Sequence, residues 1–203
     1  THFKPFFLGM LICLAGYVLF YIMITFSQIY AKSAPTVSEA GYAMGLGFSP
    51  QIFTALLMCS AISLAITIAI SGKYIDIVGR RIWLIWTTFG VAIFGLALPY
   101  FLDNGTTTSL FWFLMIGMGL IGMGYGPLAS FLPELFPTHA RYSGASLTYN
   151  ISGLFGASVA AIIALPLNAN YGLKGVGIYL TLNAVLSLIG LWFITETKDK
   201  HLA

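Results

Sequence analysis

The chain has 203 residues, of which 59% are hydrophobic and only 7% are charged, and its formal net charge is +3. This composition excludes a soluble globular domain, because too little polar surface remains to cover a folded chain of this size. The sparse charges also give no indication of a nucleic-acid partner. We expect an all-α membrane protein, since helices satisfy their own backbone hydrogen bonds inside a lipid bilayer.

Six apolar runs are long enough to cross a membrane, which requires roughly 20 residues. They lie near residues 6–30, 49–71, 82–101, 109–132, 144–167 and 175–195. The first run is too long for a signal peptide, and five more follow it. The sequence therefore predicts a single transmembrane domain over residues 1–203, with six helices. Because the chain starts at Thr1, we expect a cut there and not a natural start.

Polar side chains follow one face of the first run. Tyr17, Tyr21, Thr25 and Gln28 are separated by steps of four and three residues, which places them on the same side of a helix. In the fifth run, Tyr149 and Asn150 stand beside further polar residues. Two interpretations remain open: these side chains bind a small polar solute, or they form hydrogen bonds between helices.

The second and third runs are joined by Gly72-Lys73-Tyr74-Ile75-Asp76-Ile77-Val78-Gly79-Arg80-Arg81, the main cluster of charges in the chain. We expect a cytoplasmic connection of about ten residues. Asp76 is predicted to accept hydrogen bonds from the first N–H groups of the next helix, while Gly79 permits a tight turn. Arg80 and Arg81 would meet a carboxylate at a neighbouring helix end, and Glu134 is the candidate.

The distribution of cations predicts the orientation. With six spans, one face receives Lys4, Lys73, Arg80, Arg81, Arg141, Lys198 and Lys200, whereas the other has only Lys32 and Lys174. Because cytoplasmic loops carry the excess of Lys and Arg, both termini are expected in the cytoplasm.

The fourth run is rich in glycine and continues into Pro133-Glu134-Leu135-Phe136-Pro137-Thr138-His139-Ala140-Arg141-Tyr142-Ser143-Gly144-Ala145-Ser146. Together with Gly72, Asp76, Gly79, Arg80 and Arg81, this segment resembles the C-terminal six-helix half of a major facilitator superfamily transporter. The run from Glu134 to Ser146 is similar to that of the metabolite:proton symporter subfamily, whose members carry proline, betaine, shikimate or dicarboxylates.

The resemblance implies a twelve-helix fold whose N-terminal half is not in this sequence. It also implies a bacterial inner-membrane protein that moves a small polar metabolite, such as an organic acid, an amino acid or a betaine-like solute. Transport would be coupled to a proton and would proceed by alternating access. Asp76, Arg80 and Glu134, with Gly72, Gly79, Arg81 and Arg141, would form a cytoplasmic latch between the two halves. The polar stripes of the first and fifth runs would line the central cavity.

Rival functions are a membrane scaffold or assembly protein and an uncoupled facilitator, and the chain has no pore motif typical of a channel. Every charged side chain and histidine falls at a span end or in a loop, so coupling groups are expected mostly elsewhere. No catalytic, metal-binding or cofactor-binding constellation is apparent. Cys13 and Cys59 lie inside apolar runs, where we interpret them as packing residues.

Overall fold

A computed structural model describes residues 3–194, and their regular structure is helical apart from one isolated β-bridge between Val37 and Ala43. In chain order the helices are α1 (Phe3–Tyr21), the π-helix η1 (Ile22–Phe26), α2 (Ser27–Lys32), α3 (Pro50–Val78), α4 (Arg80–Leu102), α5 (Thr107–Glu134), the 3-10 turn η2 (Thr138–Ala140), α6 (Arg141–Gly153), the π-helix η3 (Leu154–Ser158) and α7 (Val159–Phe193).

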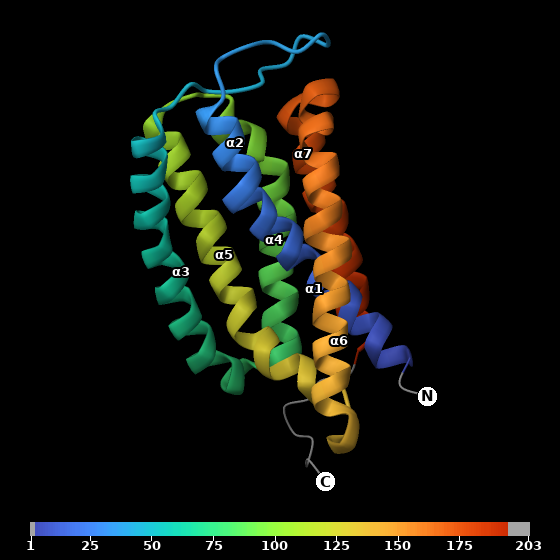
Figure 1. Cartoon of the computed structure of the whole chain (residues 1–203). Coiled ribbons are helices and arrows are strands. Elements are labelled where there is room, and N and C mark those ends of the chain that lie inside the picture. Colours follow the sequence, from blue (N-terminus) through green and yellow to red (C-terminus); the bar gives the residue numbers. More distant parts are fainter. Residues whose placement is uncertain (1–2, 195–203) are drawn as a thin grey trace.

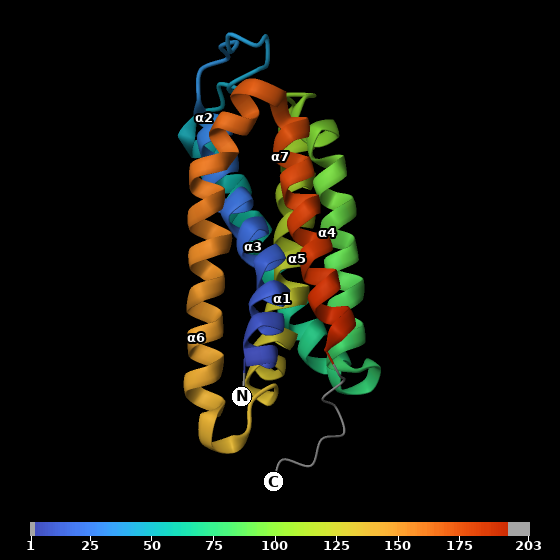
Figure 2. The same cartoon turned by 90° about the vertical axis from the view of Figure 1, so that its right-hand side faces the viewer.

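The described residues contain five helical segments that are long and apolar enough to span a membrane, where the sequence predicts six. The difference arises because the fifth and sixth runs form one segment, Thr138–Phe193, of 56 residues. This segment is interrupted inside α7 at Gly172, with φ 66° and ψ −169°, and the chain folds back there (Figure 2). An L side chain rarely adopts such a positive φ, so glycine is required at this turn.

The helices form an elongated bundle in which the connections alternate between two ends (Figure 1). The start of α1, the end of α7, the α3–α4 turn and the α5–α6 turn gather at one end. The segment between α2 and α3 lies at the other end. This arrangement places the described cations Lys4, Lys73 and Arg141 together, whereas Lys198 and Lys200 lie outside the described residues.

Two pairs of helices approach closely through glycines. Gly122 of α5 lies directly against Leu64 and Thr67 of α3, and the Ser71 hydroxyl donates to the Gly122 carbonyl at 3.4 Å. Gly95 of α4 faces Gly177 of α7 in the same way. Small residues allow helices in membranes to pack by dispersion contacts, which do not depend on water.

Large apolar side chains fill the space between these helices. Phe26 of η1, Phe53 of α3, Leu98 of α4, Phe113 of α5 and Leu180 of α7 belong to one buried cluster and are each no more than 1% exposed. The core therefore draws on α1 to α5, including η1, and on α7.

The segment between α2 and α3 is seated on the bundle. The Ser38 hydroxyl donates to the Ala169 carbonyl at 2.7 Å, and the Asn168 amide donates to the Ala43 carbonyl at 3.1 Å. The ring of Tyr42 lies against Gly172, where a β-carbon would approach it to 2.6 Å. At the start of α3, the Ser49 hydroxyl accepts a hydrogen bond from the Ile52 amide, as the Ser-Pro pair predicts.

The charged connection between the second and third runs is much shorter than predicted. α3 continues to Val78 and α4 begins at Arg80, so Gly79 alone has a non-helical conformation, with φ 103° and ψ 139°. The prediction for Gly79 is confirmed, but the predicted connection of about ten residues is wrong, because helical hydrogen bonds continue past the last apolar residue. Asp76 accepts no hydrogen bond from a backbone amide of α4 among the described residues, and its carboxylate instead meets the guanidinium of Arg80.

Candidate functional site

One cluster of charged residues joins the ends of α3, α4 and α5. Arg80, in the first turn of α4, forms an ion pair through Nη1 with Oε1 of Glu134 at the end of α5. Its Nη2 atom also lies 3.5 Å from Oδ1 of Asp76, one turn earlier in the chain. The Arg80 and Glu134 side chains are only 19% and 14% exposed, whereas that of Asp76 is 71% exposed. The pair with Glu134 is therefore the better shielded from solvent.

Arg81 has a different partner from the one that the sequence predicts. Its Nε donates to the Leu191 carbonyl at 2.8 Å, and its Nη2 donates to the Trp192 carbonyl at 3.0 Å. These carbonyls belong to the last turn of α7, where backbone acceptors have no partner within the helix and carry partial negative charge. Arg81 thus attaches α4 to the C-terminal end of α7, a contact between chain segments 110 residues apart.

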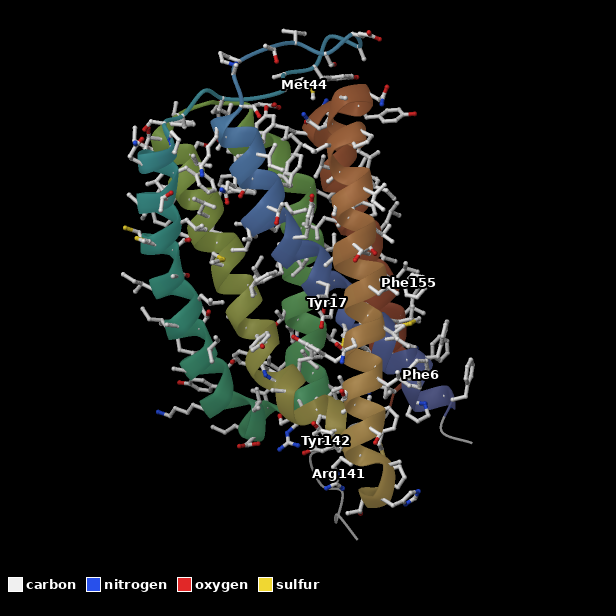
Figure 3. All side chains as sticks on the ribbon, in the orientation of Figure 1. Phe6, Tyr17, Met44, Arg141, Tyr142 and Phe155 are labelled. Atoms are coloured by element: carbon white, nitrogen blue, oxygen red, sulfur yellow. The ribbon has the colours of Figure 1, made fainter. Side chains whose placement is uncertain are left out.

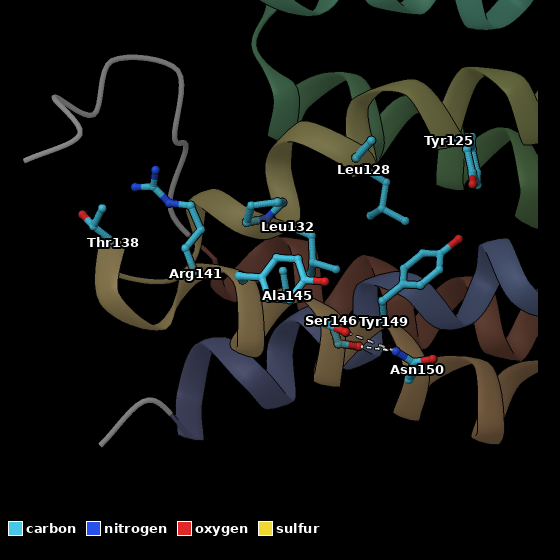
Figure 4. Close-up of a pocket in the computed structure, with 12 residues that line it drawn as sticks. Tyr125, Leu128, Leu132, Thr138, Arg141, Ala145, Ser146, Tyr149 and Asn150 are labelled. Carbon is cyan, nitrogen blue, oxygen red and sulfur yellow. Dashed lines mark hydrogen bonds between the residues drawn. The ribbon is translucent and has the colours of Figure 1, made fainter.

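An outer cavity of about 620 Å³ lies between α5 and α6 (Figure 4). Its polar lining includes Tyr125 from α5 and Arg141, Ser146, Tyr149 and Asn150 from α6. The amide of Asn150 donates to the Ser146 carbonyl at 2.8 Å, which leaves its side-chain oxygen available toward the cavity. Volume and lining are typical of a site for a small molecule.

Arg141 lines this cavity and forms no ion pair with any described residue. Its Nε atom is buried and has no hydrogen-bond partner within residues 3–194. The sequence places Arg141 with the latch residues, but among the described residues it forms no ion pair with Glu134 or Asp76. It is the one cation among the lining residues, so an anionic group would find a partner there.

A smaller space of about 310 Å³, the inner chamber, adjoins the outer cavity and is lined by residues of α1, α3, α4, α5 and α6. Tyr125, Leu128 and Tyr149 line both spaces and so stand between them. Tyr17 lines the inner chamber and packs against Tyr149, with ring centroids 5.1 Å apart. In Figure 3, Tyr17 lies midway along the bundle, whereas Arg141 and Tyr142 lie at its end. The two spaces therefore follow one another along the bundle axis.

The structure divides the predicted solute-binding residues into two groups. Tyr17, Tyr149 and Asn150 line these spaces. Tyr21, Thr25 and Gln28 line neither: the Tyr21 hydroxyl is 3.4 Å from the Ala161 carbonyl, and Thr25 and Gln28 are exposed. The regular spacing fails there because η1 is a π-helix, whose wider turn holds more residues than an α-helical turn.

Tyr125, Thr87 and Thr88 also line these spaces, although the sequence did not single them out. Tyr125 had a detectable signal, since it is a polar aromatic residue flanked by glycines within an apolar run. Thr87 and Thr88 have no such signal, because threonine is common in membrane helices and usually bonds to its own backbone.

The structure shows no single network that joins Gly72 to the other predicted latch residues among the described residues. Gly72 lies inside α3 with no atom within 4 Å of its missing β-carbon. Oε2 of Glu134 is buried and has no hydrogen-bond partner among the described residues. The charged cluster thus retains one buried acceptor in addition to the bond with Arg80.

Comparison with known proteins gives the same class of protein as the sequence motifs. Residues 34–203 match the family described as "Sugar (and other) transporter". A Haemophilus influenzae protein named "Putative metabolite transport protein" is 90% identical over 203 residues, which cover 100% of this chain and 45% of that protein. The "Inner membrane metabolite transport protein YhjE" of Escherichia coli is 39% identical over 202 residues, or 99% of this chain and 44% of that protein.

A more distant relative is the "Proline/betaine transporter" of Salmonella typhimurium, 26% identical over 191 residues, which cover 93% of this chain and 36% of that protein. No solved structure matches the chain. The chain spans about half the length of the curated relatives that it matches.

These relatives are transport proteins, which confirms the expectation that the chain is not an enzyme. They also agree with the apolar helices in indicating an integral membrane protein. The matched family covers most of the chain, and the resemblance drawn from Gly79-Arg80-Arg81 and Glu134-Leu135-Phe136-Pro137 is confirmed. The chain belongs to the Sugar (and other) transporter family of the major facilitator superfamily.

Proposed function

We propose that this chain is the C-terminal half of a secondary transporter that moves a small polar metabolite across the bacterial inner membrane. The observation that carries the proposal is the outer cavity, whose polar wall is formed by Tyr149, Asn150 and Arg141 in a chain whose relatives are transport proteins. A cavity with a few convergent polar groups is suited to a metabolite. A membrane scaffold requires no such cavity.

We further propose that the helical segments cross the membrane six times. The segment Thr138–Phe193 would be about 84 Å long if straight, nearly three times the thickness of a hydrocarbon core of about 30 Å. Because this segment folds back at Gly172, its two arms provide the fifth and sixth crossings. The relatives are about twice as long as the chain, which supports a second half of similar size. Sequencing the gene upstream of Thr1 tests this directly.

The orientation is proposed from the cations at the end of the bundle that carries Lys4, Lys73 and Arg141. This end would face the cytoplasm, because cytoplasmic loops carry the excess of positive charge. Lys73→Cys should react with an impermeant thiol reagent only from the cytoplasmic side, and Asn104→Cys only from outside. Reaction of Asn104→Cys with the reagent from the cytoplasmic side would contradict the proposed orientation.

Proton coupling is proposed from the resemblance to metabolite:proton symporters. The described lining of the two spaces contains no carboxylate. We therefore infer that the proton-binding group belongs to the other half of the transporter. In proteoliposomes that contain the full-length gene product, an imposed proton gradient should drive solute accumulation, and a protonophore should abolish it.

The substrate site is tested by replacing residues of the cavity wall in the full-length gene product. Asn150→Ala removes an amide that faces the cavity, and we expect the KM for uptake to rise about tenfold, as for the loss of one or two hydrogen bonds. Gln28→Ala is the matched control, because Gln28 is an exposed amide that lines neither space. Equal KM values for both variants would contradict the assignment of Asn150.

Residues 1–203 alone are not expected to transport. The cavity is bounded in this chain by α5 and α6 on one side only, so the second wall would come from the other half. Counterflow in liposomes that contain this chain alone would contradict the proposal that it is half of the transporter.

A further inference from the structure

The inner chamber contains two threonine hydroxyls that differ from the other buried hydroxyls of the bundle. Residues 3–194 include eight buried serines and threonines. Six of them donate a hydrogen bond to a backbone carbonyl, namely Ser27, Ser60, Ser71, Thr148, Ser152 and Ser187. Thr87 and Thr88 are the other two, and neither has a hydrogen bond to any described residue.

These two side chains are mostly buried. Thr87 is 8% exposed and Thr88 is 7% exposed, and both line the inner chamber from α4. A β-carbon on Gly124 of α5 would lie 3.7 Å from the methyl carbon of Thr87. The methyl group of Thr87 therefore packs toward α5. Because neither hydroxyl bonds to a described residue, both remain available to a ligand in the chamber that donates or accepts a hydrogen bond.

The rest of the lining determines which ligand fits. The residues that line the chamber are apolar apart from Cys13, Tyr17, Thr87, Thr88, Tyr125 and Tyr149, and none of the described lining residues is charged. A charged group would be unpaired there, which is costly in an apolar environment. A neutral group with hydroxyls or amides could bond to the two threonines and pack its carbon atoms against the walls.

We propose that the inner chamber is a binding site for an uncharged, hydrogen-bonding molecule or molecular group, held by the hydroxyls of Thr87 and Thr88. The site is distinct from the outer cavity, where Arg141 favours an anion. If the proposed transport function holds, a solute with its charge at one end and a hydroxylated, neutral body would suit both spaces. The assignment of the chamber does not require transport.

The charge preference is measured by thiol labelling in the full-length gene product with Cys13 and Cys59 replaced by alanine. Thr88→Cys places a thiol in the inner chamber, and Ala129→Cys places one in the outer cavity only. Each variant reacts with neutral hydroxyethyl methanethiosulfonate and with anionic sulfonatoethyl methanethiosulfonate, and rates are normalised to a free thiol. We expect the neutral-to-anionic rate ratio to be at least about tenfold higher for Thr88→Cys than for Ala129→Cys. The reason is that an anion in the inner chamber has no cation to pair with.

Equal rate ratios at the two positions would overturn the proposal. A thiol at position 88 that does not react with the neutral reagent would also overturn it, since the chamber would then admit no ligand. Val91→Cys, which lines the same chamber, replaces Thr88→Cys if that variant does not fold. These outcomes are independent of uptake, so a protein that fails to transport still tests the chamber.

The role of the hydroxyls is measured by protection of the thiol at position 88. Glycerol, a neutral triol, should slow labelling by the neutral reagent, whereas glycine, a zwitterion of similar size, should not. Adding Thr87→Val should raise the half-protecting glycerol concentration about three- to tenfold, and Thr87→Ser should leave it nearly unchanged. Equal protection by glycine, or equal behaviour of the Val and Ser variants, would contradict the proposed contacts.

Discussion

Arg80 of α4 and Glu134 of α5 form an ion pair at the end of the bundle that also holds the α3–α4 and α5–α6 turns. Both side chains are largely shielded, and the pair joins residues that are far apart in the sequence but adjacent in the fold. Asp76 completes the cluster from the last turn of α3 at 3.5 Å, but it is mostly exposed. Glu134 is therefore a better shielded partner of the Arg80 guanidinium than Asp76 is.

This inequality predicts different effects for the two carboxylates. Glu134→Gln should shift the balance between transporter conformations by about 1–2 kcal/mol, or roughly 5- to 30-fold in population ratio, because it removes the shielded partner. Asp76→Asn should have a smaller effect, about 0.5 kcal/mol or less, since exposed ion pairs contribute little. Distance distributions between spin labels on the two halves of the full-length gene product measure both shifts. A larger shift for Asp76→Asn would contradict this ranking.

Arg81→Lys should destabilise the bundle although the charge is retained. The guanidinium donates to two carbonyls at the end of α7, whereas a lysine ammonium cannot match this fork. We expect a loss of about 1–2 kcal/mol and a Tm lower by several degrees in detergent. Lys73→Gln is the control, because Lys73 is exposed on α3 and its loss should leave the Tm nearly unchanged.

Glycine substitutions should have opposite effects at two helical positions. Gly177→Ala would bring a β-carbon against the Gly95 carbonyl of α4, so that α4 and α7 must separate. Such overpacking costs about 1–3 kcal/mol. Gly72→Ala, by contrast, meets no atom within 4 Å and should stabilise α3 by about 0.5–1 kcal/mol through higher helix propensity. The Tm of each variant, measured by thermal unfolding, compares the two effects. A Gly177→Ala protein with a higher Tm would show that α4 and α7 are loosely packed at Gly95 and Gly177.

The stability of the end that carries Asp103 should depend on pH. Partial desolvation by neighbouring groups raises the pKa of the Asp103 carboxyl above its ordinary value although the residue is exposed, and Lys174 offsets part of this effect. A raised folded-state pKa means that the folded protein binds this proton more readily, so its contribution to stability is present at low pH and is lost as the pH rises through the folded-state pKa. Asp103→Asn should therefore raise the Tm at neutral pH, and the difference should shrink on acidification. A difference that grows on acidification would show that the pairing with Lys174 dominates.

The sequence predicted the parts of the fold that depend on local patterns. Apolar runs located the helices, and the charges at Arg80 and Glu134 pointed to their pairing. It did not predict the one-residue turn at Gly79, because hydrophobicity marks where lipid ends and not where helical hydrogen bonds end. The partner of Arg81 was also out of reach, since backbone carbonyls at a distant helix end have no signature in side-chain types.

In the candidate site, too, the sequence predicted only what depends on local patterns. Tyr17, Tyr149 and Asn150 follow from helical spacing, and they line the two spaces. Thr25 and Gln28 were assigned to the same face by counting steps of an ideal helix; they line neither space and are exposed, and their role in solute binding stays a prediction. Thr87 and Thr88 become distinctive only when every buried hydroxyl is paired with its acceptor, which requires the folded structure.

The two π-helices, η1 (Ile22–Phe26) and η3 (Leu154–Ser158), lie within the helices that carry Tyr17 and Tyr149. In such a turn a backbone amide has carbonyl acceptors four and five residues earlier within reach, so it can change acceptor while remaining bonded. Each of these helices therefore contains a point at which bending exchanges one hydrogen bond for another without breaking the helix. The ring of Tyr17 lies against Gly153, and its β-carbon lies against Gly156 inside η3, so a bend at η3 would move the wall against which Tyr17 packs.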